Sequence, residues 1–468
     1  MSVTSPGTDS ADPRDITPFG ELGRQLHGTL ILPEDAAYDE ARTVFNAMID
    51  RRPAAIARCA DTADVVAAVN FARDTGMPIA VRGGGHSVAG ESVIDGGLVI
   101  DLSSMKRVLV DPENRVARAQ AGLRLGEFIE ATEQHGLVSP TGTVSDTGLA
   151  GLTLGGGFGW LCGRYGMAVD NVIGAEVVLA DGSVAHTSDT ELEDLFWAIR
   201  GGSGNFGIVT EFEMKLHPLT QALGGMLIHP IDRAPEILRY YRELVPTLPD
   251  ELTIYTGLLT APDGNKVIAM VACWSGDEAE GERVLAPIRG FGPPLADTIQ
   301  PISYSAMNRL LDEGLAPGQR NYWKQAYLRA LDDSLIETVI EFALKAPSPN
   351  SVLLIDELHG AASRVPSRAT AFPHREARFG LVMLAVWKDP ADDDDNIAWT
   401  REVAAATRPY GTGGVYVNEA VGEKSRSAFE ENYDRLADIK ARYDPSNLFR
   451  HNTNIPPASD SPSGRAAD

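Results

Sequence analysis

Two glycine-rich runs constrain the fold of this chain more than any other feature: VRGGGHSVAG at 81–90 and GLTLGGGFG at 151–159. Glycine reaches backbone angles that are closed to other residues, and successive N–H groups in such turns can surround an anion. Neither run has the spacing of a P-loop, and neither is a GxGxxG that opens a helix. Two such loops in one domain favour a ligand with a long phosphate portion, but the glycines alone are equally compatible with tight turns between strands.

Length and charge narrow the class of protein. The chain has 468 residues, of which 43% are hydrophobic and 23% are charged, and these values are typical of a globular protein with two or three domains. The formal net charge of −24 would repel a phosphate backbone, so we expect no nucleic-acid partner. No apolar run reaches the roughly 18–20 residues that cross a bilayer, so we expect no membrane partner either.

The ends of the chain and its cysteines favour a cytoplasmic location. The polar N-terminus lacks the basic and apolar regions of a signal peptide, and we expect residues 1–30 to be a flexible leader and 458–468 a disordered tail. Cys59, Cys162 and Cys273 form no CxxC pair and no disulfide framework. The histidines fall at neither HxxxH nor HExxH spacing, so the sequence predicts no metal site.

From about 54 to 217 the sequence alternates short apolar strands with helix-like segments. The segment 62–76 begins at a capping residue, Asp61 or Thr62, and ends at Gly76. The elements predicted in this region are helices 62–76, 124–136 and 192–202, and strands 56–60, 98–105, 114–122, 171–183 and 205–216.

The region from about 218 to 410 has a different pattern. It contains the strand-like runs LTIYTGLL, KVIAMVACW, SVLLIDELHG and FGLVMLAVW, with helices such as SLIETVIEFALKA between them. This grouping predicts an α+β domain built on an antiparallel sheet. The segment 427–457 reads as a helix that Asp444-Pro445 stops, followed by a turn and an extended strand.

Four motifs then occur in a fixed order: VRGGGHSVAG, TGTVSDTGLAGLTLGGGFGWLCGRYGMAVDNVIGAEVVLADG, LFWAIRGGSGNFGIVTEFE and ARYDPSNLFRHNTNIPP. Together they resemble the flavin-linked oxidases of the vanillyl-alcohol oxidase and p-cresol methylhydroxylase superfamily, in its berberine-bridge-enzyme-like branch. The resemblance covers roughly residues 50–457, and it is strongest to the bacterial members that include 6-hydroxy-D-nicotine oxidase.

The resemblance implies an α+β fold in three parts. A two-subdomain FAD-binding domain of the p-cresol methylhydroxylase type would occupy 31–217. A substrate domain, with an antiparallel sheet covered by helices, would occupy 218–420. A C-terminal segment at 421–457 would return to the FAD-binding domain.

The resemblance also implies FAD as the cofactor, with its pyrophosphate over the 82–87 loop and a covalent bond from a ring nitrogen of His86 to the flavin 8α-methyl carbon. A neutral imidazole is a good nucleophile near pH 7. The other cofactor-binding positions that it implies are Arg82, Gly83, Gly84, Gly85, Ser87, Gly90, Thr143, Thr147, Gly148, Gly151, Leu152, Gly156, Gly157, Gly159, Gly207, Ile208, Val209, Asn452 and Asn454.

Within this set, the resemblance gives three positions a more specific role. Thr147 aligns with the position that controls access of oxygen to the flavin in relatives. Ile208 and Val209 match the strand beside the adenine, and Asn452 and Asn454 lie in a strand near the flavin ring.

Many members of the family hold the flavin twice, through this histidine and a cysteine. The cysteine lies upstream of the second glycine run, where this chain has Val144. Cys162 follows that run, and we expect it to be a small buried residue. The comparison predicts a single covalent bond, at His86.

The candidate catalytic residues lie in two strand-like segments. GGVYVNEA at 413–420 resembles the strand that carries a tyrosinate base in several relatives, so Tyr416 is the first candidate, and alternation puts Asn418 on its face. In NYWKQAYL at 321–328, Tyr322 and Lys324 share one face and are further candidates.

Other side chains of these and neighbouring strands remain open. Trp323 and Gln325 share the opposite face of 321–328, and the sequence does not decide which face lines a pocket. Glu357 and His359 are weaker candidates, for which an ion pair on the sheet surface is the favoured interpretation.

The leading hypothesis is a flavin-dependent oxidase that moves a hydride from a C–H bond of a small alcohol, sugar or cyclic amine to flavin N5, with reoxidation by O2. The first alternative is a dehydrogenase of the same family that uses a quinone or another electron acceptor. The second is a flavin-binding protein without turnover. The sequence does not indicate which oligomeric state the protein adopts.

Overall fold

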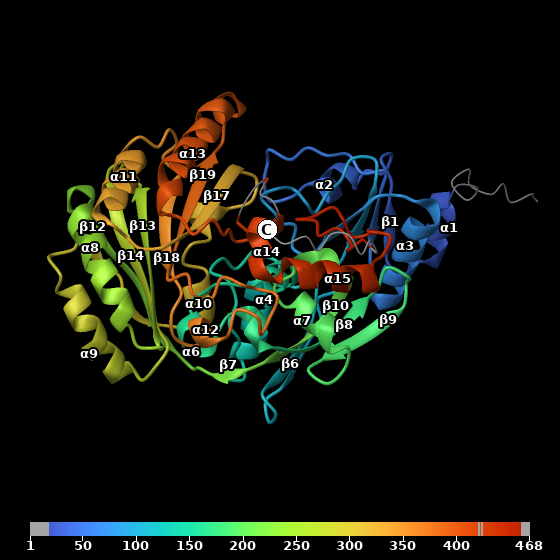
Figure 1. Ribbon diagram of the computed structural model, residues 1–468, viewed down its shortest axis with the longest axis horizontal. Coiled ribbons are helices and arrows are strands. Elements are labelled where there is room, and N and C mark those ends of the chain that lie inside the picture. The colour runs from blue at the N-terminus through green and yellow to red at the C-terminus, as the bar shows by residue number, and fades with distance from the viewer. Residues whose placement is uncertain (1–17, 420–421, 423–424, 460–468) are drawn as a thin grey trace, which may run out of the picture.

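The computed structural model describes residues 18–419, 422 and 425–459, and it contains two α+β lobes side by side (Figure 1). One lobe is built from the chain up to about residue 218, and the other is built on a single large sheet. No helix within the described ranges is both long and apolar enough to span a bilayer.

The N-terminal lobe begins with a four-stranded sheet of order β1-β2-β4-β3, in which β2 and β3 both run parallel to β4. Helix α3 (Thr62–Thr75) connects β2 to β3, as parallel neighbours require. Its cap is Asp61, whose side chain accepts from the Asp64 N–H, and it ends at Gly76 with φ +70°. The strands are β1 (Thr29–Ile31), β2 (Ala55–Arg58), β3 (Ile79–Arg82) and β4 (Leu98–Asp101).

A five-stranded antiparallel sheet of order β5-β6-β10-β8-β9 completes this lobe. Its strands are β5 (Val108–Asp111), β6 (Val116–Gln120), β8 (Val172–Val178), β9 (Val184–Ser188) and β10 (Ile208–Lys215). The remaining elements of the lobe are α1 (Pro18–Gln25), α2 (Tyr38–Arg42), α4 (Leu125–Glu133), β7 (Leu137–Val138), α5 (Leu149–Gly155), α6 (Cys162–Tyr165), α7 (Glu193–Ile199) and β11 (His217–Pro218).

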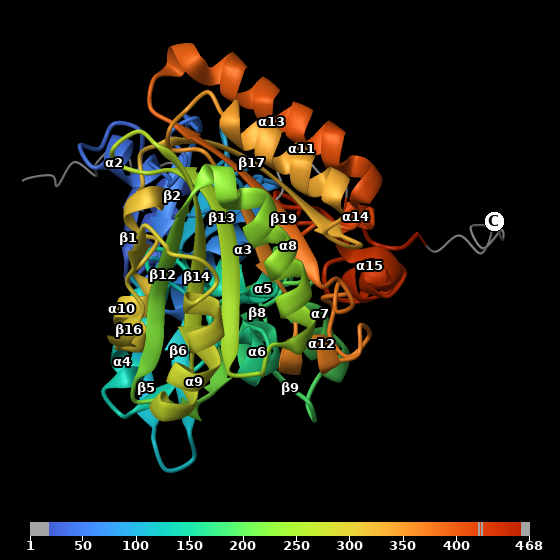
Figure 2. The ribbon, with the colours of Figure 1, turned by 90° about the vertical axis from the view of Figure 1, so that its left-hand side faces the viewer.

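The second lobe is an antiparallel sheet with helices on one face (Figure 2). The main path of the sheet is β15-β12-β14-β13-β18-β19-β17, and β16 pairs with β12. The strands are β12 (Ala222–Pro230), β13 (Leu252–Thr260), β14 (Lys266–Trp274), β15 (Ala296–Asp297), β16 (Gln300–Ile302), β17 (Arg320–Leu328), β18 (Val352–Glu357) and β19 (Phe379–Trp387). The helices are α8 (Ala234–Leu244), α9 (Glu278–Arg289), α10 (Tyr304–Asn308), α11 (Asp333–Leu344), α12 (Gly360–Arg364) and α13 (Asp393–Thr407).

The central strands of this sheet are apolar on both faces. On β19, Leu381 and Met383 pack into the core under the helices, whereas Val382 and Leu384 alternate with them and border the cavity described below. A strand with two covered faces reads as a continuous apolar run rather than an alternating one, which is why FGLVMLAVW has no polar position.

The C-terminal segment returns to the N-terminal lobe through α14 (Ser425–Phe429) and α15 (Tyr433–Tyr443), and α15 packs beside α7 (Figure 1). Lys440 is fully buried there and donates to Asp444 Oδ2 at 2.7 Å and to the carbonyl oxygens of Asn205 and Phe449. Asp444 also accepts from the backbone N–H groups of Leu448 and Phe449. The buried Lys440–Asp444 pair and these backbone hydrogen bonds therefore hold the segment RYDPSNLF against the N-terminal lobe.

Two expectations from the sequence are corrected. Residues 18–30 are not a flexible leader, because α1 packs on α3 and β1 pairs with β2; residues 1–17 of that leader and 460–468 of the expected tail lie outside the described residues. The stretch 413–419 is a loop and turn rather than a strand, since its side chains are held by contacts with other elements and not by a sheet ladder.

Candidate active site

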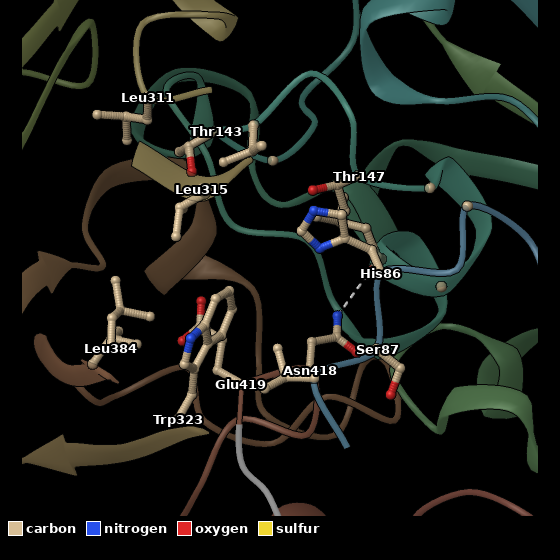
Figure 3. Close-up of a pocket in the computed structure, with 18 of the residues that line it drawn as sticks. His86, Ser87, Thr143, Thr147, Leu311, Leu315, Trp323, Leu384, Asn418 and Glu419 are labelled. Atoms are coloured by element: carbon tan, nitrogen blue, oxygen red, sulfur yellow. Dashed lines mark hydrogen bonds between the residues drawn. The ribbon is translucent and has the colours of Figure 1, made fainter. Parts of the chain in front are cut away.

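A cavity of about 1620 Å³ lies between the inner face of the large sheet and the glycine loops of the N-terminal lobe. Residues from both glycine runs, from β17, β18 and β19, and from the loop after Tyr416 border it. In Figure 3, His86 and Thr147 lie on one side of the open space, and Trp323 and Leu384 lie on the other.

The two glycine runs form one wall of the cavity because they pack directly on each other. A Cβ atom on Gly84 would lie 2.5 Å from the Cα of Gly148, and one on Gly148 would lie 2.4 Å from the Gly84 nitrogen. Gly85 has φ +71°, a conformation that favours glycine. Any side chain at these positions would push the loops apart or fill the cradle. Their backbone therefore fits the close approach of a long phosphate-bearing ligand such as FAD.

His86 follows this cradle and presents a reactive atom to the cavity. Its Nε2 is buried and has no hydrogen-bond partner among the described residues. Phe45 stacks on the imidazole with ring centroids 3.8 Å apart and the planes at 21°, and the Phe45 N–H donates to the Gly85 carbonyl. Burial, together with the nearby Arg124, lowers the pKa of His86 to about 4. The ring is therefore a neutral imidazole at pH 7 with a free nitrogen.

Most of the cofactor-binding positions expected from the sequence border the cavity. These are Gly83, Gly84, Gly85, His86, Ser87, Thr143, Thr147, Gly148, Gly151, Leu152, Gly207, Ile208, Val209 and Asn452. The others, which do not border it, are Arg82, Gly90, Gly156, Gly157, Gly159 and Asn454.

The positions outside the cavity wall support it from behind. The Arg82 guanidinium donates to the carbonyl oxygens of Ala41 and Ser92. A Cβ on Gly90 would lie 2.8 Å from atoms of Ile49, and one on Gly159 would lie 2.0 Å from the Thr141 carbonyl. Gly90 and Gly159 therefore allow close packing of these loops.

Tyr416 and Asn418 are brought together although they do not lie on a strand. The Tyr416 phenolic oxygen accepts from the Gly157 N–H at 2.8 Å and from Asn418 Nδ2 at 2.9 Å. The Tyr416 N–H donates to Gln325 Oε1 at 2.7 Å. Burial raises the pKa of Tyr416 above its usual value, and the two hydrogen bonds oppose that shift. The side chain is a fixed phenol at neutral pH.

The faces of β17 are decided by its register with β19. Trp323 pairs with Leu384, and both border the cavity. Lys324 pairs with Met383 and Tyr322 pairs with Ala385, on the helix-covered face, where Arg401 of α13 donates to the Tyr322 hydroxyl at 3.3 Å. The expectation that Tyr322 and Lys324 are catalytic is therefore corrected, because neither borders the cavity.

The structure also places the weaker candidates and the two positions considered for a second flavin bond. Glu357 is buried and pairs with the partly buried His359. Burial lowers the pKa of His359, but the hydrogen bond to Glu357 and its charge outweigh that effect and raise it overall. Cys162 lies in a separate apolar cluster and does not border the cavity, and burial raises its pKa to about 12. Val144, in contrast, borders the cavity.

Two carboxyl groups of the cavity were missed by reasoning from the sequence. Burial raises the pKa of Glu91 to about 7 and that of Glu419 well above its ordinary value. Glu91 follows VRGGGHSVAG directly, and Glu419 lies in the segment that carries Tyr416. The only signal in the sequence is that both residues lie in or beside these motifs, and this does not predict which way their side chains point.

His27, Asp61 and Asp64 bring three potential metal-ligand atoms within 4.8 Å of one another, outside the cavity. The Asp64 carboxylate already accepts from the N–H groups of His27, Gly28 and Ala60. This group is explained by the turn that it fixes.

Comparisons with known proteins agree with this geometry. Residues 53–188 match a family described as FAD binding domain, and residues 415–456 match one described as berberine and berberine like. The chain is 34% identical to (R)-6-hydroxynicotine oxidase of Paenarthrobacter nicotinovorans, over 92% of this chain and 97% of that protein.

Solved structures give the same result for the fold. The crystal structure of 6-hydroxy-D-nicotine oxidase from Arthrobacter nicotinovorans is similar, with a TM-score of 0.86 and 30% identity over 92% of this chain and 98% of that one. A chitooligosaccharide oxidase is similar with a TM-score of 0.83 and 26% identity, over 95% of this chain and 100% of that one.

Proposed function

The chain belongs to the berberine-bridge-enzyme-like family of FAD-linked oxidoreductases, and from this we propose that it carries FAD on a single covalent bond from His86 and oxidises a small organic alcohol, sugar or cyclic amine. When bound, FAD supplies an acceptor at flavin N5 for a hydride from a substrate C–H bond, and O2 restores its oxidised state. The observation that carries the proposal is the buried, unpartnered Nε2 of His86 at the cavity wall.

The residues around His86 support a role in covalent attachment. The glycines at 83–85 border the same cavity as the ring, so a pyrophosphate could lie against their backbone. The lowered pKa of His86 keeps the imidazole neutral and nucleophilic at pH 7, and Phe45 holds its plane by stacking. Val144 offers no second nucleophile to the cavity and Cys162 lies outside it, which supports a single bond.

Tyr416 is the residue that we propose to orient the substrate. Its oxygen is fixed by the N–H of Gly157 and the amide of Asn418, so its own O–H is left to donate toward a substrate heteroatom. These two donors would also stabilise a phenolate, whereas burial opposes it. Tyr416 can therefore accept a proton from the substrate only if contacts with the bound substrate offset the cost of burying a phenolate.

Acid precipitation of the purified protein tests the attachment. We expect wild-type protein to stay yellow after precipitation and to yield one flavin-bearing peptide that contains His86, whereas His86→Ala should release its flavin. A variant that keeps colour after precipitation would show that the bond is elsewhere. Release of one hydrogen peroxide per substrate turned over in air would support the oxidase assignment, and turnover only with a quinone or dye would support a dehydrogenase.

A further inference from the structure

The part of the cavity wall that β18 and β19 contribute is apolar over most of its length. Val382 and Leu384 on β19 and Leu354 on β18 border the cavity. The next residue in the β18 row is Asp356, which pairs in register with Gly380. A Cβ atom on Gly380 would lie 2.2 Å from Asp356 Oδ1. Glycine at 380 therefore leaves space for a carboxylate where the apolar rows would otherwise continue.

A second carboxyl group reaches the same end from the loop that carries Tyr416. This loop runs alongside β17 in space, because Gly411 forms a bridge with Leu328 and the Tyr416 N–H donates to Gln325. The Glu419 N–H then closes a turn onto the Tyr416 carbonyl at 3.1 Å. Glu419 thus borders the cavity a single turn after the tyrosine, and Figure 3 draws it on the same side as Trp323.

One oxygen of the Glu419 carboxyl group lacks a partner among the described residues. This atom, Oε2, is buried and makes no hydrogen bond to any of them. The strongest charged neighbour of Glu419 is Asp356, whose negative charge adds to the effect of burial in raising the pKa of Glu419. Two interacting carboxyl groups in a site of low polarity would be stabilised by a cation that enters between the apolar walls.

We propose that Glu419 and the face of Trp323 bind the cationic nitrogen of a hydrophobic amine, so that an amine rather than a sugar or a neutral alcohol is the substrate class. This inference rests on the proposed oxidoreductase function of the same cavity. A carboxylate pairs strongly with an ammonium donor, and an indole face attracts a cation. The Trp323 ring is held in place by its own bond to Asn321 Oδ1 at 3.2 Å.

The rest of the wall fits the hydrocarbon part of such a molecule. Leu311, Leu315 and Leu384 line the space opposite and beside Trp323 (Figure 3). A sugar bound there would bury several hydroxyl groups against leucines and valines, and each hydroxyl without a partner would be costly. The apolar rows of β18 and β19 and the carboxyl groups of Glu419 and Asp356 at their end together favour a small apolar body with one charged nitrogen.

The test compares ligands that differ only in charge. Benzylamine, its N-methyl and N,N-dimethyl derivatives, and benzyl alcohol are titrated into the purified flavin-containing protein by isothermal calorimetry at pH 7.5. The same titrations follow for Glu419→Gln and for Glu313→Gln, since Glu313 is an exposed carboxylate that borders the same cavity. Thermal melting and flavin content show whether each variant is folded and loaded.

We expect at least one amine to bind wild-type protein more tightly than benzyl alcohol, and Glu419→Gln to weaken that amine about tenfold or more. Binding of the alcohol should change less than about twofold, and Glu313→Gln should match wild type. The proposal is wrong if no amine binds better than the alcohol, or if Glu419→Gln weakens both ligands equally. If wild-type protein contains no covalently attached flavin, that result would count against the proposed function instead. The mass of the flavin peptide measures this separately.

Discussion

The backbone N–H of Gly157 donates a hydrogen bond of 2.8 Å to the phenolic oxygen of Tyr416, although 259 positions separate the two residues. This bond joins the second glycine run to the loop that carries the candidate catalytic tyrosine. A Cβ on the preceding Gly156 would lie 3.3 Å from the Tyr416 ring, so the glycine run also leaves room for that ring. The second glycine run and the candidate catalytic side chain are therefore joined by a contact between segments that are distant in the sequence.

Replacing Tyr416 by Phe is expected to reduce turnover by roughly 10²–10⁴-fold, the usual range for loss of a group that holds or moves a proton. It also leaves the buried Gly157 N–H without its acceptor, so the free energy of unfolding should fall by about 1–3 kcal/mol. Steady-state kinetics and denaturant unfolding measure the two effects. Tyr322→Phe is the matched control, because that hydroxyl faces α13, and it should retain turnover near wild type. Equal losses in both variants would contradict the role of Tyr416.

The sequence could predict the two faces of β17 but not which one lines the cavity. Alternation separates Tyr322 and Lys324 from Trp323 and Gln325 in any strand. The choice depends on α13, which is more than 60 residues later in the chain, and on the register with β19. Such packing between distant segments is absent from a local pattern.

The glycine turns could be predicted more fully, because the constraints on them are local. The left-handed φ of Gly85 and the helix end at Gly76 follow from residue type. In the segment 413–420, in contrast, the family resemblance implied a strand. The described part of that stretch is fixed by Gln325 and Gly157, partners that no periodicity reveals. Tyr416 and Asn418 nevertheless meet, since a turn can also bring residues i and i+2 together.

A cysteine at position 144 is expected to reach the cofactor where the natural Cys162 does not. Val144 borders the cavity beside Thr143, whereas Cys162 is buried in another cluster. We expect Val144→Cys to give a flavin that bridges two peptides after digestion, and Cys162→Ala to leave the single His86 peptide unchanged. Mass spectrometry of the flavin peptides distinguishes the outcomes. A flavin attached to Cys162 in wild-type protein would refute the assignment.

The buried pair Lys440–Asp444 is expected to be a major contributor to the stability of the C-terminal segment. Removing one member of a buried pair leaves an uncompensated charge and typically costs about 3–5 kcal/mol. Asp444→Ala would also remove the acceptor of the Leu448 and Phe449 N–H groups. Denaturant unfolding should show that loss. Asp434→Ala, which breaks the exposed pair with Arg426, should change stability by less than about 1 kcal/mol. Similar effects of the two substitutions would contradict this account.

Stability is expected to fall on acidification because His217 is held neutral in the fold. Burial lowers the pKa of His217 to about 4 from its ordinary value of 6.5, and nearby basic residues add to the shift. Its ring stacks on Tyr165 at 3.9 Å, and its Nε2 lies 2.7 Å from Asn171 Oδ1. Between pH 6.5 and 4, His217 binds a proton in the unfolded chain but stays neutral in the folded chain. The free energy of unfolding should therefore decrease as pH falls through that window.

Unfolding by denaturant at several pH values between 7.5 and 4 measures this slope. His217→Gln cannot take up the proton in either state, so its stability should decline less steeply than that of wild type over the same range. His186→Gln is the matched control, because His186 is an exposed residue of β9, and it should keep the wild-type slope. If the slope of His217→Gln equals that of wild type, the pH dependence arises from other groups, and the neutral buried state assigned to His217 is wrong.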